Sequence, residues 1–277
     1  MEATTTNPNE NRSRDVMQGA ARLLVIVVWV SALLFGLYIF IFYFVGALVG
    51  DISLWNEGLP GLYDQDTQTA NIGIGAHFAA GSIILMLGSI QLINRVRLKY
   101  PSVHRWLGRL YVLASLVTAI GGLAFIFTKG TIGGTVMDIG FTGYGVLTFL
   151  AALATIYYAR QRDFDRHRAW AIRLYALAIG SWIYRMDYGF WFLFTDGLGH
   201  TRHFNGTFDY VMDFFFYLPN LLVAEIFIGR WSLMKNKFAT GFATFGMVLA
   251  SLFLILATYF FTAKMWVPSM LQVLGDL

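Results

Sequence analysis

The chain has 277 residues, of which 57% are hydrophobic and 13% are charged, and its formal net charge is +4. Soluble domains carry about 25% charged residues, so this composition indicates a membrane protein. The chain contains no cysteine, which excludes disulfides, iron–sulfur clusters, thiolate metal sites and cysteine nucleophiles. Its basic residues lie in short loops between apolar runs rather than on one soluble face, which argues against a nucleic-acid partner.

The apolar runs predict one helical membrane domain at residues 21–277, preceded by a polar, disordered leader at residues 1–20. About 20 apolar residues cross a bilayer core as a helix. Seven runs meet this requirement, at approximately 23–49, 72–93, 107–128, 136–159, 170–195, 210–229 and 239–263. The fold class is therefore an all-α membrane protein with seven transmembrane helices. Within the sixth run, Pro219 and Asn220 predict a kink or break.

The distribution of Lys and Arg predicts the orientation. Three basic residues precede the first span, five follow the second, five follow the fourth and three follow the sixth, against three on the opposite side. Basic residues favour the cytoplasmic side. We therefore predict a cytoplasmic N-terminus, an external C-terminus and location in the cytoplasmic (inner) cell membrane.

Two short stretches are similar to each other: HRWLGRLYVLA begins at His104, and HRAWAIRLYALA begins at His167. Each lies at the predicted cytoplasmic entrance of a span and follows an apolar span that ends in a basic loop. This pattern predicts a duplicated helical hairpin, in which spans two and three recur as spans four and five. In such a duplication the two histidines occupy related positions at one depth.

Two histidines on different helices can ligate the iron of a b-type haem, so His104 and His167 are candidate haem ligands. Four nearby arginines are candidate donors to the haem propionates: Arg105, Arg109, Arg168 and Arg173. No metal other than a haem iron is predicted. The alternative is that all six residues are interfacial. The histidines then donate to backbone or lipid phosphate, and the arginines bind anionic headgroups on the cytoplasmic face.

His77 lies inside the second span. The same helical face continues with Gly81, Ile84, Gly88 and Gln91. Small residues on one face leave room for a flat macrocycle or, alternatively, for a close-packed neighbouring helix. The remaining histidines, His200 and His203, lie in a predicted outer loop and are expected to be solvated.

Arg185 lies about 15 residues into the fifth span, where a charge costs at least about 2.5–3.5 kcal/mol and needs a partner. The candidates are Asp187, Asp213 and Glu225, and we predict an Arg185–Asp213 ion pair. With Gln91 these residues form a predicted buried polar core. The core is either a structural ion pair or a site for an ion, a proton or a quinone.

The segments AHFAAGSIILMLGSIQL, PSVHRWLGRLYVL and DFDRHRAWAIRLYALAIGSWIYR resemble a bacterial family of multi-pass membrane proteins catalogued as a domain of unknown function. The resemblance covers about residues 70–230 and rests on the HRxxGRxY and HRxWxIRxYA motifs. It implies a helical membrane bundle with these motif positions: His77, Gly88, Gln91, His104, Arg105, Gly108, Arg109, Tyr111, His167, Arg173 and Arg185. A weaker likeness links the chain to membrane b-type cytochromes, but position 77 has no histidine counterpart in the second hairpin.

Two functions follow as hypotheses. The first is a redox or electron-transfer membrane protein, or a subunit of one, with a b-type haem or a quinone as cofactor. The second is a non-enzymatic protein, either a transporter-like carrier with an Arg185–Asp213 core or an accessory subunit that packs against partner membrane subunits. The sequence assigns no catalytic residue and does not decide whether the protein is an enzyme.

Overall fold

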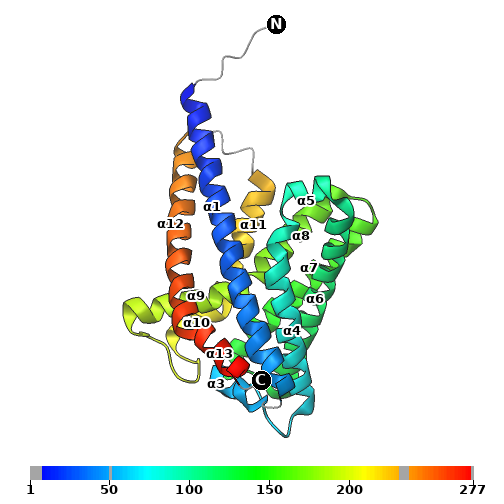
Figure 1. The fold of residues 1–277 in the computed structure, drawn as a ribbon, viewed down its shortest axis with the longest axis vertical. Coiled ribbons are helices and arrows are strands. Elements are labelled where there is room, and N and C mark those ends of the chain that lie inside the picture. Colours follow the sequence, from blue (N-terminus) through cyan, green and yellow to red (C-terminus); the bar gives the residue numbers. More distant parts are fainter. Residues whose placement is uncertain (1–7, 50–51, 231–236, 276–277) are drawn as a thin grey trace.

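A computed structural model describes residues 8–49, 52–230 and 237–275, and every regular element in these ranges is a helix (Figure 1). The α-helices are α1 (Pro8–Ile39), α2 (Gly46–Val49), α3 (Trp55–Gly58), α4 (Gln68–Gln91), α5 (Asn94–Lys99), α6 (Pro101–Lys129), α7 (Thr135–Arg160), α8 (Phe164–Ala178), α9 (Gly180–Thr195), α10 (Thr207–Phe215), α11 (Leu218–Arg230), α12 (Lys237–Phe261) and α13 (Val267–Gly275). Short π or 3-10 turns lie at Phe40–Val45, Ile52–Leu54 and Thr262–Trp266.

The first and last helices define the two ends of the bundle. Helix α1 begins beyond one end, which we call the N-side, and α13 lies at the opposite end, which we call the C-side (Figure 1). Helix α5 and the beginnings of α6 and α8 lie at the N-side. The turn between α6 and α7 lies at the C-side.

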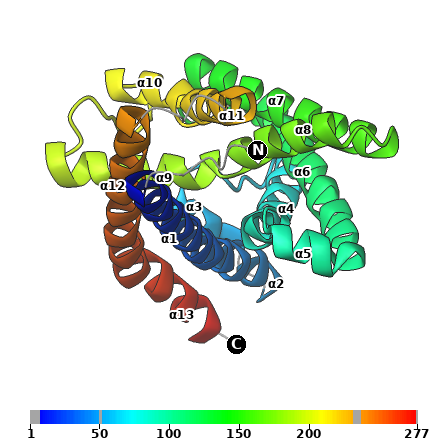
Figure 2. The same cartoon turned by 90° about the horizontal axis from the view of Figure 1, so that it is seen from above.

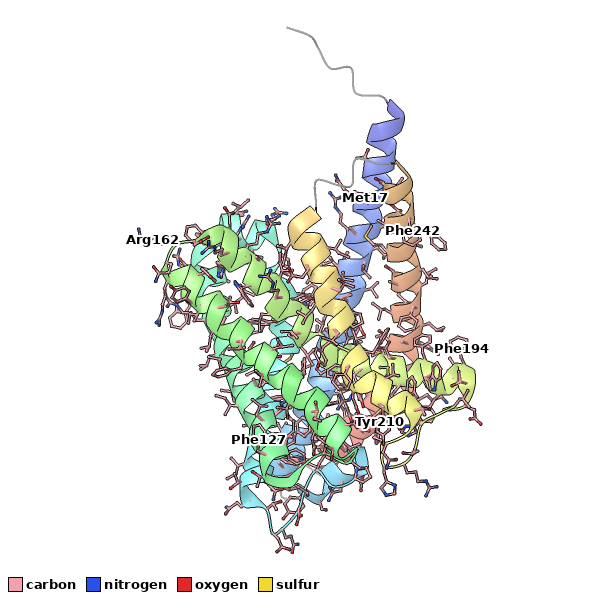
Figure 3. All side chains as sticks on the ribbon, turned by 180° about the vertical axis from the view of Figure 1, so that it is seen from behind. Met17, Phe127, Arg162, Phe194, Tyr210 and Phe242 are labelled. Atoms are coloured by element: carbon pink, nitrogen blue, oxygen red, sulfur yellow. The ribbon has the colours of Figure 1, made fainter. Side chains whose placement is uncertain are left out.

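Six helical stretches of the described ranges are long and apolar enough to cross a membrane: Asp15–Val49, Gln68–Gln91, Pro101–Lys129, Thr135–Arg160, Thr207–Gly229 and Thr240–Gly275. Their outward surfaces are apolar. Phe127 and Phe242 are 73% and 80% exposed and project from the bundle (Figure 3). Such a surface is stable against lipid rather than water.

The expected disordered leader is helical from Pro8 onward, because α1 starts there. Proline suits the first turn of a helix, and the following Glu, Arg, Gln, Met and Ala residues are good helix formers, so nothing ends the helix before the apolar run. Residues 1–7 lie outside the described ranges.

Helix α4 belongs to both hydrophobic cores of the bundle (Figure 2). One core packs α4 against α1, α9 and α12, and the other packs it against α6, α7 and α8. Helices α4 and α6 touch backbone to backbone at Gly73 and Gly121, where a Cβ on either residue would collide with the carbonyl of the other. Helix α7 packs along α8 in the same way that α4 packs along α6, giving two helical hairpins. Their origin by duplication stays a prediction.

The predicted fifth span is absent from the six stretches, and its residues form two helices divided at Ile179, α8 and α9, of 15 and 16 residues. The hydroxyl of Tyr144 donates to the carbonyl of Leu177 at 2.9 Å, which satisfies a backbone group at the break. Beyond the break, α9 runs across the bundle rather than along it (Figures 1 and 3).

The predicted break in the sixth span is confirmed, since α10 ends at Phe215 and α11 begins at Leu218. The side-chain amide of Asn220 donates to the carbonyl of Phe216 at 2.8 Å. The break between α8 and α9 contacts the break between α10 and α11, because a Cβ on Gly180 would lie 3.1 Å from the Phe216 carbonyl oxygen. Two discontinuous helices therefore contact each other at their interruptions.

Candidate functional site

The two His-Arg motifs open α6 and α8 at the N-side of the bundle (Figure 1). Helix α6 starts with Pro101, which fits the first helical position. Helix α8 is capped by Asp163, whose carboxylate accepts the backbone N–H of Arg166 at 3.1 Å. His104 and His167 are each the fourth residue of their helix.

The structure brings the two histidines close enough to interact electrostatically. His167 Nδ1 lies 2.9 Å from the carbonyl oxygen of Thr155 on α7. Because a carbonyl only accepts, Nδ1 carries the proton and Nε2 is left as an acceptor. His104 Nδ1 is buried and has no hydrogen-bond partner within the part of the chain that the structure describes.

The tyrosines of the two Arg-Leu-Tyr triplets meet at one glycine. A Cβ on Gly88 would lie 3.0 Å from Tyr111 Cε2 and 3.2 Å from Tyr175 Cε2. The Tyr175 and Ser89 hydroxyls are 2.9 Å apart, whereas the buried Tyr111 hydroxyl has no partner. The side chain of Gln91 follows on the same helix.

We call this N-side group the paired-motif site: Ser89, Gln91, His104, Tyr111, His167 and Tyr175. A Cβ on Gly108 would lie 3.4 Å from Gln91 Oε1, so this amide reaches α6 between the turns that carry His104 and Tyr111. The Gln91 Nε2 atom is also buried without a partner. The site therefore holds three buried polar atoms with unused hydrogen-bonding capacity, which is costly without a ligand or water.

The four arginines lie around this site without entering it. Arg105 donates to the Ser102 hydroxyl at 3.2 Å, and the Arg109 guanidinium lies 5.5 Å from the Trp106 ring centre. Arg168 is exposed. Arg173 forms a bidentate pair with Glu225 on α11, with Nη2 2.9 Å from Oε2, and stacks on Trp170 at 4.6 Å. Arg173 is thus already neutralised within the protein.

His77 packs directly against α6. Its Nδ1 donates to the Thr118 carbonyl at 2.8 Å, and a Cβ on Gly122 would lie 2.9 Å from that nitrogen. Gly122 therefore serves the close packing of α6 against His77, and a macrocycle beside the Gly81–Gln91 face stays a prediction.

The predicted Arg185–Asp213 ion pair is wrong. Among the residues that the structure describes, Arg185 donates only to the Ser181 carbonyl of its own helix, at 3.3 Å, and it lies 5.1 Å from the centre of the Phe35 ring. The carboxylate oxygens of Asp213 have no hydrogen-bond partner in the described ranges. The transverse course of α9 explains the error, because depth along a straight helix does not give the position of Arg185.

The other predicted partners of Arg185 also lie elsewhere. Glu225 pairs with Arg173. Asp187 forms no hydrogen bond or ion pair with any residue of the described ranges. Arg185 instead interacts electrostatically with His77 and Tyr38, in the middle of the bundle. Among the described residues no carboxylate lies within ion-pair distance of this guanidinium.

A second polar group, missed by the sequence reasoning, surrounds Asp209 at the C-side. Asp209 is fully buried, and its Oδ1 lies 2.7 Å from both the Tyr188 hydroxyl and His200 Nδ1. The backbone N–H groups of Thr201 and Gly206 donate to Oδ2. His200 is therefore not the solvated loop residue that we expected, since only 14% of its side chain is exposed. The acidic residue in the first turn of α10 was the available signal.

We call this second group the C-side cluster: Tyr184, Tyr188, His200, Asp209 and Asp213. The described residues contain no group of three or more His, Asp or Glu side chains that could hold a metal ion.

Comparison with known proteins identifies the family. The family model described as "Predicted membrane protein (DUF2306)" matches residues 74–228, more than half of the chain and close to the region expected from the motifs. No curated protein and no solved structure matches the chain. The matched range includes every residue of the paired-motif site and of the C-side cluster, and also His77 and Glu225. The chain belongs to this family of predicted membrane proteins of unknown function.

Proposed function

We propose that the chain crosses the cytoplasmic membrane seven times, with the N-side facing the cytoplasm. The predicted fifth span supplies the crossing that the six stretches lack, through α8, the transverse α9 and the loop that follows it. Helix α8 starts at the N-side, and the loop after α9 reaches the C-side turn between α6 and α7, where a Cβ on Gly133 would lie 2.7 Å from the Phe204 carbonyl. The excess of Lys and Arg at the N-side supports the orientation.

Cysteine labelling tests this topology cleanly, because the chain has no cysteine of its own. Arg162 lies exposed at the N-side edge (Figure 3), and Arg202 lies exposed in the C-side loop. In intact cells a membrane-impermeant maleimide should label Arg202→Cys and leave Arg162→Cys unlabelled until the cells are opened. Labelling of position 162 from outside would overturn the orientation.

The paired-motif site supports a redox membrane protein, or a subunit of one, that binds the headgroup of a quinone. The observation that carries this proposal is the set of three buried, unpartnered atoms: Tyr111 Oη, Gln91 Nε2 and His104 Nδ1. A quinone presents two carbonyl oxygens as acceptors, and the tyrosine hydroxyl and the amide nitrogen are donors. When bound, a quinone supplies two-electron chemistry coupled to protons.

The residues of the site have distinct roles in this proposal. Tyr111 and Gln91 bind and orient the headgroup, and the packed helices α4, α6 and α8 exclude water from it. His104 holds or releases a proton at Nδ1, the position that lacks a partner. The Ser89 and Tyr175 hydroxyls hydrogen-bond to each other, and these two side chains form one wall of the site.

A b-type haem between His104 and His167 fits the packing less well than a quinone does. The space beside Gly88 is filled by the Tyr111 and Tyr175 rings rather than open to a macrocycle. Arg173, expected to contact a propionate, is bound to Glu225. One feature remains favourable to haem, since the bond from His167 Nδ1 to Thr155 leaves Nε2 available as a ligand atom.

The experiment is purification in mild detergent, followed by solvent extraction and ultraviolet quantification of quinone, with titration of a short-chain quinone analogue. Tyr111→Phe and Gln91→Leu should each weaken binding about tenfold, the effect of one neutral hydrogen bond. Tyr157→Phe is the matched control, because Tyr157 is exposed and makes only a ring contact. Absence of quinone and of analogue binding refutes the proposal. Soret and alpha bands in a reduced-minus-oxidised spectrum, with haem supplied, would favour haem instead.

A second candidate function is a carrier for an organic anion, favoured by the unpaired Arg185. A guanidinium at this depth is costly without a counter-charge, and its Nε and Nη2 atoms make no hydrogen bond with the described residues. Arg185→Lys keeps the charge, whereas Arg185→Gln removes it. Uptake of a labelled carboxylate into proteoliposomes should survive the first change better than the second, and equal loss in both variants argues against a charge-based role.

A further inference from the structure

Asp213 has an unusual environment within the described part of the chain. Its side chain is completely buried in α10, and both carboxylate oxygens lack a hydrogen-bond partner. An ionised carboxylate in such surroundings loses its hydration without compensation. Protonation removes this cost, so the position suits a carboxyl group that carries a proton.

The position of Asp213 supports a functional rather than a packing role. It lies two residues before the end of α10, next to the point where the breaks of α8–α9 and α10–α11 meet. Discontinuous membrane helices commonly line ion and substrate sites, because a break is tolerated where the backbone borders a cavity.

A chain of hydrogen bonds runs from Tyr184, which interacts electrostatically with Asp213, to the C-side surface, and none of its bonds reaches the Asp213 carboxylate itself. The Tyr184 hydroxyl donates to the Tyr188 hydroxyl at 3.2 Å, and Tyr188 donates to Asp209. Asp209 is bonded to His200, which lies in the loop between α9 and α10 and is partly exposed. Asp209 and Asp213 are four residues apart on α10, so their side chains share a helical face.

We propose that Asp213 is a proton-binding carboxyl group that exchanges its proton with the C-side surface through Asp209 and His200. On uptake, the proton leaves Nδ1 of the charged imidazole of His200 and passes to Oδ1 of Asp209. It then moves one helical turn along α10 to the carboxylate of Asp213. His200 ends neutral, Asp209 ends ionised, and no electrons are transferred.

The groups facing Asp213 permit this exchange. Asp209 on the same helix and Tyr184 on α9 are the titratable groups that interact with it electrostatically. Helix α7 presents Gly140, which contributes no side chain and touches the Asp213 backbone. No Lys or Arg side chain of the described ranges is paired with Asp213, so its charge is balanced only by a proton.

Dicyclohexylcarbodiimide tests the protonated state, because it enters membranes and modifies carboxyl groups that hold a proton. The carboxyl proton passes to a carbodiimide nitrogen while the carboxylate oxygen bonds to the central carbon. Mass spectrometry of the treated, detergent-solubilised protein should locate the adduct at Asp213, with labelling that falls as pH rises. Glu225→Gln is the matched control and should label normally, because Arg173 already holds the Glu225 carboxylate ionised.

Asp213→Asn should lose the adduct. If that variant does not fold, peptide mapping of the wild-type adduct decides the question alone. An adduct elsewhere, or none, overturns the proposal, and protection of Asp213 by sodium ions shows that it holds a metal cation instead. The route is tested by infrared spectroscopy, in which transfer to heavy water shifts the C=O band of the protonated carboxyl group. His200→Gln should slow this shift at least about tenfold, and an unchanged rate overturns the route.

Discussion

The Arg173–Glu225 ion pair provides the most direct test of the structure, because it replaces the pair predicted from the sequence. It joins α8 to α11 through two parallel hydrogen bonds. Exposed ion pairs contribute about 0.2–1 kcal/mol. The bidentate geometry favours the upper end of this range, while the 49% exposure of the Glu225 side chain argues against a larger value. We therefore expect a coupling free energy of about 1 kcal/mol.

The assay is a double-mutant cycle with Arg173→Met and Glu225→Gln, in which the free energy of unfolding is measured in detergent by tryptophan fluorescence. The control cycle uses Arg185→Met and Asp213→Asn. Those side chains form no ion pair, so their effects should add within about 0.5 kcal/mol. Additive effects in the first cycle together with strong coupling in the second would refute the arrangement of α8, α9 and α11.

Three further predictions follow from single contacts. Gly121→Ala places a methyl group against the facing α4 backbone and should lower the free energy of unfolding by about 1–2 kcal/mol, whereas Gly246→Ala meets nothing and should be neutral or stabilising in a melting experiment. Tyr144→Phe leaves a backbone carbonyl of α8 without its donor and should cost about 1–3 kcal/mol, with a wild-type melting temperature counting against the break at Ile179. The backbone N–H of Asp66, and secondly the side chain of Lys129, lower the pKa of Asp64 below its ordinary value of 3.8. A lowered carboxyl pKa adds stability above pH 3.8 that is lost as the pH falls through the folded-state value, so Lys129→Met should flatten the acid end of the stability profile.

Hydropathy predicts most of the helical stretches, because it reports directly on transfer into lipid, whereas the orientation predicted from the Lys and Arg residues stays a prediction. Six of the seven apolar runs correspond to helical stretches long and apolar enough to cross a membrane, and one of these, Thr207–Gly229, is interrupted between α10 and α11. The break between Phe215 and Leu218 was predictable from Pro219, since proline lacks the backbone donor that would bond one turn back along a continuous helix. The break at Ile179 was not, because it depends on the Tyr144 hydroxyl and the Phe216 carbonyl, which come from other helices.

In the candidate site, too, features set by neighbouring residues in the sequence were predictable, whereas features set by contacts between helices were not. Recurrence of the His-Arg motif placed His104 and His167 at one end of the bundle, and the structure brings them together there. The meeting of Tyr111 and Tyr175 at Gly88 was not anticipated, although both belong to the repeated triplet, because it depends on how α4 lies between α6 and α8. The partner of Arg185 was predicted wrongly for a related reason, since partner choice depends on the direction of α9.

The two polar groups are built from separate side chains on either side of the helix breaks. Helix α8 carries His167 and Tyr175 before the break, and α9 carries Tyr184 and Tyr188 after it. No residue belongs to both groups, and within the described residues no side-chain hydrogen bond joins a member of one group to a member of the other. Effects at well-separated sites without shared partners add. A paired-motif variant that loses quinone binding should therefore keep normal carbodiimide labelling of Asp213 in the C-side cluster. The quinone proposal and the proton-binding proposal can thus be tested separately.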